Sequence, residues 1–481
     1  MPGGASARRV PRARPLAPSL ALDPLPPVPC RRDGANRLDG ANRLDGARGG
    51  GRMASVRLVV TFAALFAAVA LLQLSSGGLG PLDALSGLAL GFSAAEVGLL
   101  GSAHYVGFFL GCWWAPRLMG SVGHSRAFAA CTAAGAMGTI GHTLVVDPYA
   151  WAAMRVASGL CVAGCYTVVE SWLQAQAAER SRGRAFSAYR TADLGASLAA
   201  QGLIGFLAPL DLYVAYNILA LLCVASLVPL TLTTARQPET PEAPRLRPGL
   251  ALARSPLAAL SVVVAGLTGS AFRMVGPVYG QEVGLRPDQI GLFLVAFVAG
   301  GVAGQIPTGR LADRYDRRWV LIALGALSVA ACTAAAAASE AGAAAVIAAS
   351  ALFGAATFPI YSVAASHAHD FAEAPERVEL SAALLFWFAV GAIASPLLAS
   401  ELIDAFGPAA LFGLIAAAHG ALIGFGLVRM TVRPAETRTA YIYAPRTSFL
   451  LGRLLGSRRE RRPEAASAPM PRAERSGGAP R

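Results

Sequence analysis

Charged side chains fall inside long apolar stretches of this 481-residue chain. Asp193 follows Arg190 by three residues, about one helical turn, in a segment that is otherwise mostly apolar. An ionised group in hydrocarbon costs at least about 2.5–3.5 kcal/mol on insertion scales, so it usually faces a cavity or a charged partner. Asp193 could therefore bind and release a proton, or it could form a purely structural pair with Arg190.

Other polar groups in these stretches could line the same pathway. Tyr166 and Glu170 share one helix face at a four-residue step, although Glu170 could instead make a structural contact to a nearby arginine. Arg273 lies deep in another apolar stretch, where either a protein partner or an anionic substrate is expected. The predicted proton or substrate pathway comprises Arg155, Tyr166, Glu170, Arg190, Asp193 and Arg273.

The stretches that carry these residues are long enough to be membrane spans. With 55% hydrophobic and 14% charged residues, the chain is unlike an ordinary soluble protein. Apolar windows of about 20 residues recur, each able to cross a bilayer as a helix. We predict an all-α integral membrane protein with twelve transmembrane helices, at residues 57–77, 92–116, 126–146, 149–174, 184–207, 211–233, 256–277, 289–308, 319–338, 342–364, 379–401 and 407–429.

The net charge of +13 is distributed as in a membrane protein rather than a nucleic-acid-binding protein. The cationic residues are arginines, and they gather in alternate loops, as at Arg180–Arg184 and Arg310–Arg318. The intervening loops hold acids such as Asp83, Asp147 and Glu340. This positive-inside pattern places both termini in the cytoplasm.

Composition also divides the chain into segments. Residues 1–52 are rich in Pro, Gly and Arg, and Met53 stands directly before the first span, so translation could start there. In the C-terminal tail, Phe449–Arg462 could lie on the membrane as a short helix or be solvated. The predicted segments are a disordered basic leader (1–52), an N-terminal six-helix half (53–233), a cytoplasmic linker (234–255), a C-terminal six-helix half (256–430) and a basic cytoplasmic tail (431–481).

The two halves echo each other in sequence. GFFLGCWWAPRLMGSVGHSR, from Gly107, aligns without gaps with GGVAGQIPTGRLADRYDRRW, from Gly300. GRLADRYDRR, at Gly309–Arg318, resembles the cytoplasmic loop signature of the major facilitator superfamily (MFS). The resemblance implies that a small residue lets two helices approach and that an acid pairs with loop cations until the inner face opens. It assigns this conformational switch to Gly309, Asp313, Arg314, Arg317 and Arg318, with Asp316 standing where the family usually has glycine.

RVASGL, from Arg155, resembles the RxxxG element of proton-coupled MFS members. Three further motifs resemble a bacterial MFS subgroup whose prototype is an uncharacterised enterobacterial permease: ESWL from Glu170, SHAHD from Ser366 and APRTS from Ala444. The resemblance implies two rocking halves, a small-molecule substrate, proton coupling, a monomer and the bacterial cytoplasmic membrane. Multidrug efflux and organic-anion or metabolite transport are both open, and a membrane sensor or scaffold that moves nothing is the alternative.

Signatures of other protein classes are missing from the sequence. It contains no Walker phosphate loop and no GxSxG or HExxH motif, so neither ATP-driven transport nor an enzyme is indicated. Cys161 and Cys165 share a helix face, but two thiolates without further ligands make a poor metal site. We therefore predict no metal, no cofactor and no nucleic-acid partner.

Overall fold

The protein is all-helical in the computed structural model, which describes residues 42–176, 182–233, 245–373 and 376–432. The chain forms two compact units, residues 1–54 and 55–481. Of the first unit the structure describes residues 42–54, which form the start of helix α1. The predicted leader up to residue 41, the linker at 234–244 and the tail from 433, including Phe449–Arg462, lie outside the described residues.

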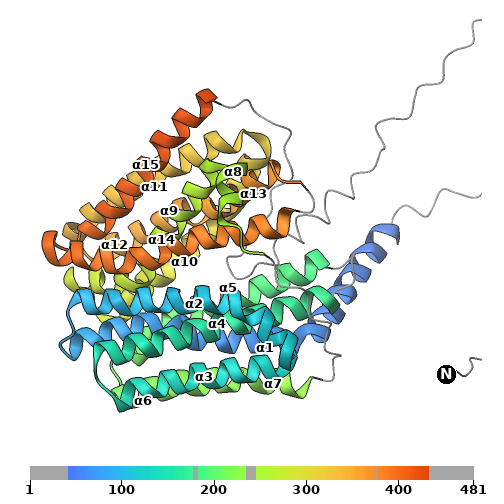
Figure 1. The fold of residues 1–481 in the computed structure, drawn as a ribbon, viewed down its shortest axis with the longest axis horizontal. Coiled ribbons are helices and arrows are strands. Elements are labelled where there is room, and N and C mark those ends of the chain that lie inside the picture. The colour runs from blue at the N-terminus through green and yellow to red at the C-terminus, as the bar shows by residue number, and fades with distance from the viewer. Residues whose placement is uncertain (1–41, 177–181, 234–244, 374–375, 433–481) are drawn as a thin grey trace, which may run out of the picture. The chain divides into compact units, whose positions relative to one another are not determined.

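Helices of the second unit fall into two groups (Figure 1). One group holds α2–α7 and the part of α1 from residue 55, and the other holds α8–α15. The helices are α1 (Asn42–Ala89), α2 (Ala94–Val122), α3 (His124–Leu144), α4 (Pro148–Gln176), α5 (Arg182–Leu207), α6 (Leu212–Ala225), α7 (Leu227–Leu232), α8 (Pro248–Arg254), α9 (Pro256–Glu282), α10 (Pro287–Arg314), α11 (Arg317–Ala338), η1 (Ser339–Ala341), α12 (Ala343–Thr357), α13 (Pro359–Asp370), α14 (Arg377–Phe406) and α15 (Ala410–Val432).

Nine helices of the described residues are long and apolar enough to cross a membrane. Each predicted span overlaps one helix or one consecutive pair, but α2, α3 and α5 are not among the nine. These three are rich in Gly, Ala and polar residues, which lowers their mean hydropathy. The first predicted span was too short: α1 continues to Ala89, so Asp83 lies inside a helix and not in a loop.

The glycines that align between the halves make equivalent helix contacts. A Cβ at Gly107 of α2 would collide with the Val156 carbonyl oxygen of α4, and one at Gly300 of α10 with the Ala351 carbonyl oxygen of α12. Only glycine allows these backbones to approach so closely. The similar sequences of the two halves thus form the same close helix contact, once in each half.

We expect Gly300→Ala to destabilise the fold by about 1–3 kcal/mol, because the added methyl must push α10 and α12 apart. Gly195→Ala is the matched control, since nothing lies within 4 Å of a Cβ at that helical position. The two variants gain the same intrinsic helix propensity, about 0.8–1 kcal/mol. Thermal unfolding in detergent should separate them, and equal melting temperatures would contradict the close helix contact.

Within the described residues, the halves meet mainly where α2 packs on α14 and where α5 packs on α10, and α2 also contacts α9. At the end where α2 and α10 begin, a Cβ at Gly98 would lie 2.7 Å from the Pro396 carbonyl oxygen, and one at Gly205 would lie 3.0 Å from the Asp288 Cα. We call this the closed end. The opposite end, which carries Arg317 and Arg318, is called the arginine-rich end.

Candidate transport site

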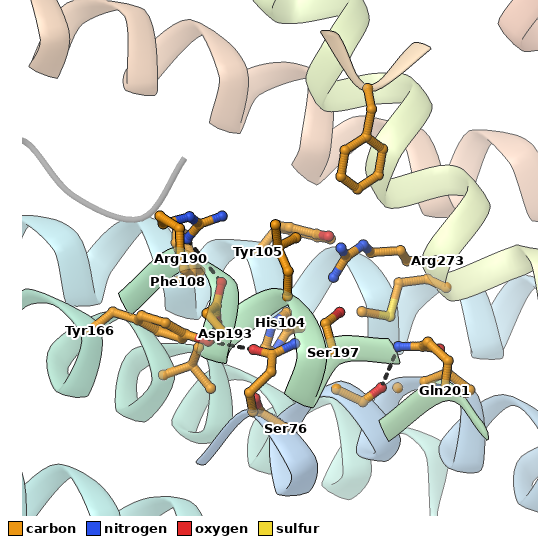
Figure 2. Close-up of a pocket in the computed structure, with 18 of the residues that line it drawn as sticks. Ser76, His104, Tyr105, Phe108, Tyr166, Arg190, Asp193, Ser197, Gln201 and Arg273 are labelled. Atoms are coloured by element: carbon orange, nitrogen blue, oxygen red, sulfur yellow. Dashed lines mark hydrogen bonds and ion pairs between the residues drawn. The ribbon is translucent and has the colours of Figure 1, made fainter. Parts of the chain in front are cut away.

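A cavity of about 180 Å³ lies between the two halves. Its walls come from α1, α2, α4 and α5 of one half and from α9, α10, α13 and α14 of the other. Amide, hydroxyl and charged groups line it together with aromatic rings, as Figure 2 shows. Because both halves contribute, any relative movement of the halves would change the cavity.

Asp193 lies on this cavity with partners on two sides. Its Oδ2 is 2.9 Å from Arg190 Nη1, and its Oδ1 accepts a hydrogen bond of 2.5 Å from the Tyr166 hydroxyl. The same hydroxyl contacts Gln73 Oε1 of α1. Side chains of α4 and α5 therefore meet at one carboxylate, and Tyr166 connects them to α1 through Gln73. Three of the predicted pathway residues lie together there (Figure 2).

Glu170 lies apart from this group. It is buried and accepts a hydrogen bond of 3.1 Å from the Tyr189 hydroxyl, but it is not among the residues that line the cavity. Its partner Tyr189 comes from α5, so the contact joins α4 to α5. The structure thus separates two carboxylates that the sequence placed in one pathway.

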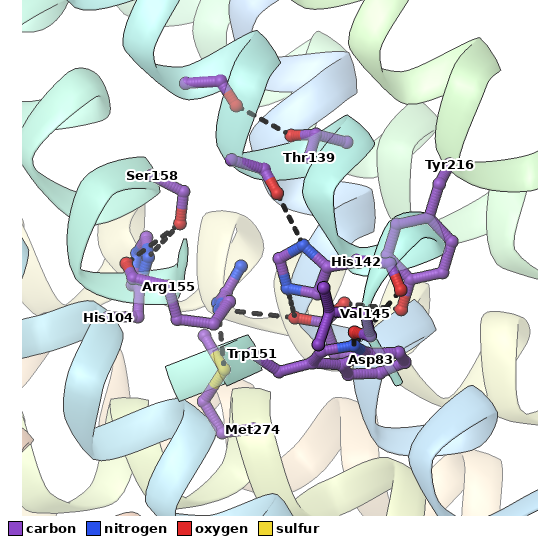
Figure 3. Close-up of polar contacts among 12 residues, drawn as sticks. Asp83, His104, Thr139, His142, Val145, Trp151, Arg155, Ser158, Tyr216 and Met274 are labelled. Carbon is purple, nitrogen blue, oxygen red and sulfur yellow. Dashed lines mark hydrogen bonds and ion pairs between the residues drawn. The ribbon is translucent and has the colours of Figure 1, made fainter. Parts of the chain in front are cut away.

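Arg155 belongs to a second buried network, drawn in Figure 3. Only 1% of Arg155 is exposed, so its charged group must find a partner inside the protein. Its Nε lies 3.3 Å from Asp83 Oδ2, while Asp83 Oδ1 accepts a 2.7 Å hydrogen bond from the Tyr216 hydroxyl. The ion pair removes the need for Arg155 to reach water.

Aromatic rings and a histidine enclose this pair. His142 Nε2 lies 3.7 Å from Asp83 Oδ2, and the His142 ring stacks on Tyr216 at 5.3 Å. Trp151 Nε1 donates to the Val145 carbonyl oxygen at 2.8 Å. Asp83 and His142 were missed as site residues because Asp83 was assigned to a loop, although the apolar run after Gly80 indicated that the helix continues.

Met274 connects the second network to the cavity. Arg155 Nη2 lies 3.6 Å from Met274 Sδ, and Met274 lines the cavity from α9. A Cβ at Gly101 of α2 would also lie 2.8 Å from Met274 Cβ, so Met274 sits where the halves meet. The Asp83–Arg155 pair therefore lies behind the cavity wall at the closed end.

Arg273 precedes Met274 and lines the same cavity. Figure 2 shows it across the cavity from Arg190 and Asp193. Within the described residues, no carboxylate lies within ion-pair distance of its guanidinium, in contrast to Arg155, Arg190 and Arg317. The predicted pathway residues thus divide into a cavity group, the separate Glu170 and the Arg155 network.

The predicted switch loop joins α10 to α11 at the arginine-rich end. Gly309 is buried, whereas Asp313 and Arg314 are exposed at the end of α10. Arg317 Nη1 lies 2.5 Å from Asp370 Oδ2 and donates to the Ser366 carbonyl oxygen at 3.0 Å. Ser366 and Asp370 begin and end the SHAHD motif, so two sequence motifs meet through one arginine.

Asp316 is the N-cap of α11. Its Oδ1 accepts a 3.0 Å hydrogen bond from the Arg318 backbone N–H, and its Oδ2 lies 2.8 Å from Arg318 Nη2. Burial opposes ionisation of Asp316, but the hydrogen bonds from Arg318 outweigh it and hold the pKa below the usual value. With φ at −61°, this position does not require glycine, which explains how aspartate can stand there.

Comparison with known proteins is consistent with this architecture. The sequence profile of the Major Facilitator Superfamily matches residues 59–265 and 258–461. An uncharacterised MFS-type transporter of Enterobacter sp. (strain 638) is 28% identical over 67% of this chain and 83% of its own length. The uncharacterised MFS-type transporter YcaD of Escherichia fergusonii is 26% identical over the same shares. The predicted resemblance to an enterobacterial permease is confirmed.

Solved structures show the same fold at low identity. The nucleoside transporter NupG superposes with a TM-score of 0.60 at 14% identity, covering 78% of this chain and 98% of its own. A D-xylose–proton symporter superposes with a TM-score of 0.58 at 13% identity, covering 78% and 97%. With two profile matches that together span most of its length, this multi-pass membrane protein belongs to the Major Facilitator Superfamily.

Proposed function

We propose that this protein is a proton-coupled secondary transporter that moves a small molecule through the cavity between its halves. The observation that supports the proposal is the cavity, which residues of both halves line. Asp193 is one of these residues, and its carboxylate contacts Arg190 and Tyr166. A protonatable carboxylate on a solute cavity can link proton binding to solute binding, since both change the same contacts.

We also propose that the chain crosses the membrane twelve times and that both termini lie in the cytoplasm. Each predicted span overlaps a helix. The described loop between α10 and α11, which leads into Arg317 and Arg318, lies at the end opposite the closed end, and the positive-inside rule assigns such a loop to the cytoplasm. The membrane is the bacterial cytoplasmic membrane, and the protein works as a monomer. The relatives in Enterobacter and Escherichia support this location.

Alternating access follows from the contacts between the halves. The halves touch at the closed end through Gly98 and Gly205, which supports an inward-facing state. In that state the ion pair of Arg317 with Asp370 stays within the C-terminal half, from α11 to α13. Protonation of Asp193 would release Arg190, and we propose that this change permits the halves to rock to the opposite state.

A flux screen in proteoliposomes tests transport against the sensor or scaffold alternative. Vesicles carry the purified protein, an internal pH dye and an imposed pH gradient, and a panel of organic acids, sugars, nucleosides and cationic drugs is added one at a time. We expect at least one compound to change the internal pH faster than in protein-free vesicles. If no compound moves in either direction, in protein that unfolds cooperatively, the transport proposal is wrong.

A further inference from the structure

We propose that the cavity binds a small organic monoanion through a carboxylate held by Arg273. The inference rests on the proposed function, because the bound anion is taken to be the transported solute. It deepens that function by naming the chemical class of the solute. The cavity supports the inference, together with Arg273, which lines the cavity and has no carboxylate partner among the described residues.

The charges of the side chains that line the cavity do not sum to zero. They are Arg190, Asp193 and Arg273, and the first two form an ion pair of 2.9 Å. One positive charge therefore remains on Arg273, across the cavity from that pair (Figure 2). A ligand with one negative charge would neutralise the cavity, whereas a cation would add a second unbalanced charge.

Arg273 cannot remove its charge by losing a proton, because the guanidinium group stays protonated in proteins. In the described part of the chain, the buried Arg155 and Arg317 lie against Asp83 and Asp370. None of the carboxylates in that part of the chain lies at such a distance from Arg273. Its planar donors match the two oxygens of a carboxylate, so a carboxylate ligand would supply the missing partner in bidentate geometry.

The remaining lining indicates what the rest of the ligand resembles. Phe108, Phe358 and Phe388 present aromatic rings, and the buried Ser197 Oγ has no hydrogen-bond partner in the described residues. Gln201 donates to the Gly77 carbonyl oxygen at 3.1 Å, which fixes its amide at the cavity wall. A compact carboxylate with an apolar or aromatic body and at most a few hydroxyl groups fits this lining and the volume of about 180 Å³.

Paired acids and amides test this assignment by thermal shift. The wild-type protein in detergent is heated with benzoate, lactate or pyruvate, and separately with benzamide or lactamide, which keep the shape but lose the charge. We expect at least one carboxylate to raise the melting temperature, and its amide to leave it unchanged. If carboxylates produce no shift, or if amide and acid shift it equally, the assignment is wrong.

Variants locate the binding at Arg273. Arg273→Gln should abolish the shift, and Arg273→Lys should weaken binding at least tenfold, since lysine keeps the charge but not the planar donors. Arg286→Gln is the matched control, because Arg286 is exposed and pairs with Asp288 away from the cavity. An unchanged shift in both Arg273 variants would overturn the proposal.

The proposed transport function can fail separately. If the flux screen finds a neutral solute while no carboxylate binds, transport stands and the monoanion assignment falls. If carboxylates bind through Arg273 and nothing moves across the vesicle membrane, the site stands and transport falls.

Discussion

Arg155→Ala is expected to lower the free energy of unfolding by about 3–5 kcal/mol, because it leaves Asp83 buried without its cation. Both side chains are almost fully enclosed, at 1% exposure each. Tyr216 and His142 remain beside the carboxylate, but neither provides a permanent positive charge. Unfolding in mixed detergent micelles, followed by circular dichroism, measures the loss.

Two controls separate charge from packing in this experiment. Arg286→Ala removes an exposed arginine that also pairs with an aspartate, and it should cost at most about 1 kcal/mol. The double variant Asp83→Asn with Arg155→Gln removes both charges and should recover a large part of the loss. If the double variant is as unstable as Arg155→Ala, the ion pair is not the cause.

Asp193→Asn is expected to abolish solute accumulation driven by a pH gradient while leaving exchange of solute for solute intact. Asparagine keeps the size of the side chain and can still accept from the Tyr166 hydroxyl, but it cannot bind or release the proton. We expect proton-driven uptake to fall at least tenfold. Uptake and counterflow of a solute found in the flux screen, measured in the same vesicles, provide the two rates.

Asp211→Asn provides the matched control for that experiment. Asp211 is exposed before α6 and its side chain makes no capping hydrogen bond to that helix, so the same substitution should leave both rates unchanged. Full accumulation by Asp193→Asn would show that the proton binds elsewhere, and Asp193 would then be a structural partner of Arg190. Loss of both rates in Asp193→Asn would indicate a damaged site rather than a missing proton.

The helical fold was predictable because hydropathy repeats at the length of a membrane span. Glycines that align between the halves, such as Gly107 with Gly300, also indicated the internal repeat from the sequence alone. Helix ends were less predictable, because hydropathy falls at polar residues whether or not the helix stops. Asp83 is an example. An aspartate shortly after Pro81 is typical of a loop, but Asp83 lies inside α1, where Arg155 of α4 balances its charge.

The cavity group could be predicted only in part. The helical spacing placed Arg190 beside Asp193, and the structure confirms that contact at 2.9 Å. Spacing on one helix could not show that Tyr166 of α4 reaches Asp193 of α5. It also could not show that Glu170, on the same face of α4 as Tyr166, does not line the cavity. Such pairings depend on how helices rotate against each other, which a single sequence does not specify.

The measurement that tests the central claim most directly is uphill proton movement driven by solute alone. Proteoliposomes with equal pH on both sides receive a gradient of a solute identified in the flux screen, and the internal pH is recorded. The account predicts a pH change that depends on the solute gradient in wild-type protein and is absent in Asp193→Asn. Solute movement without any pH change in the wild type would contradict proton coupling through the cavity.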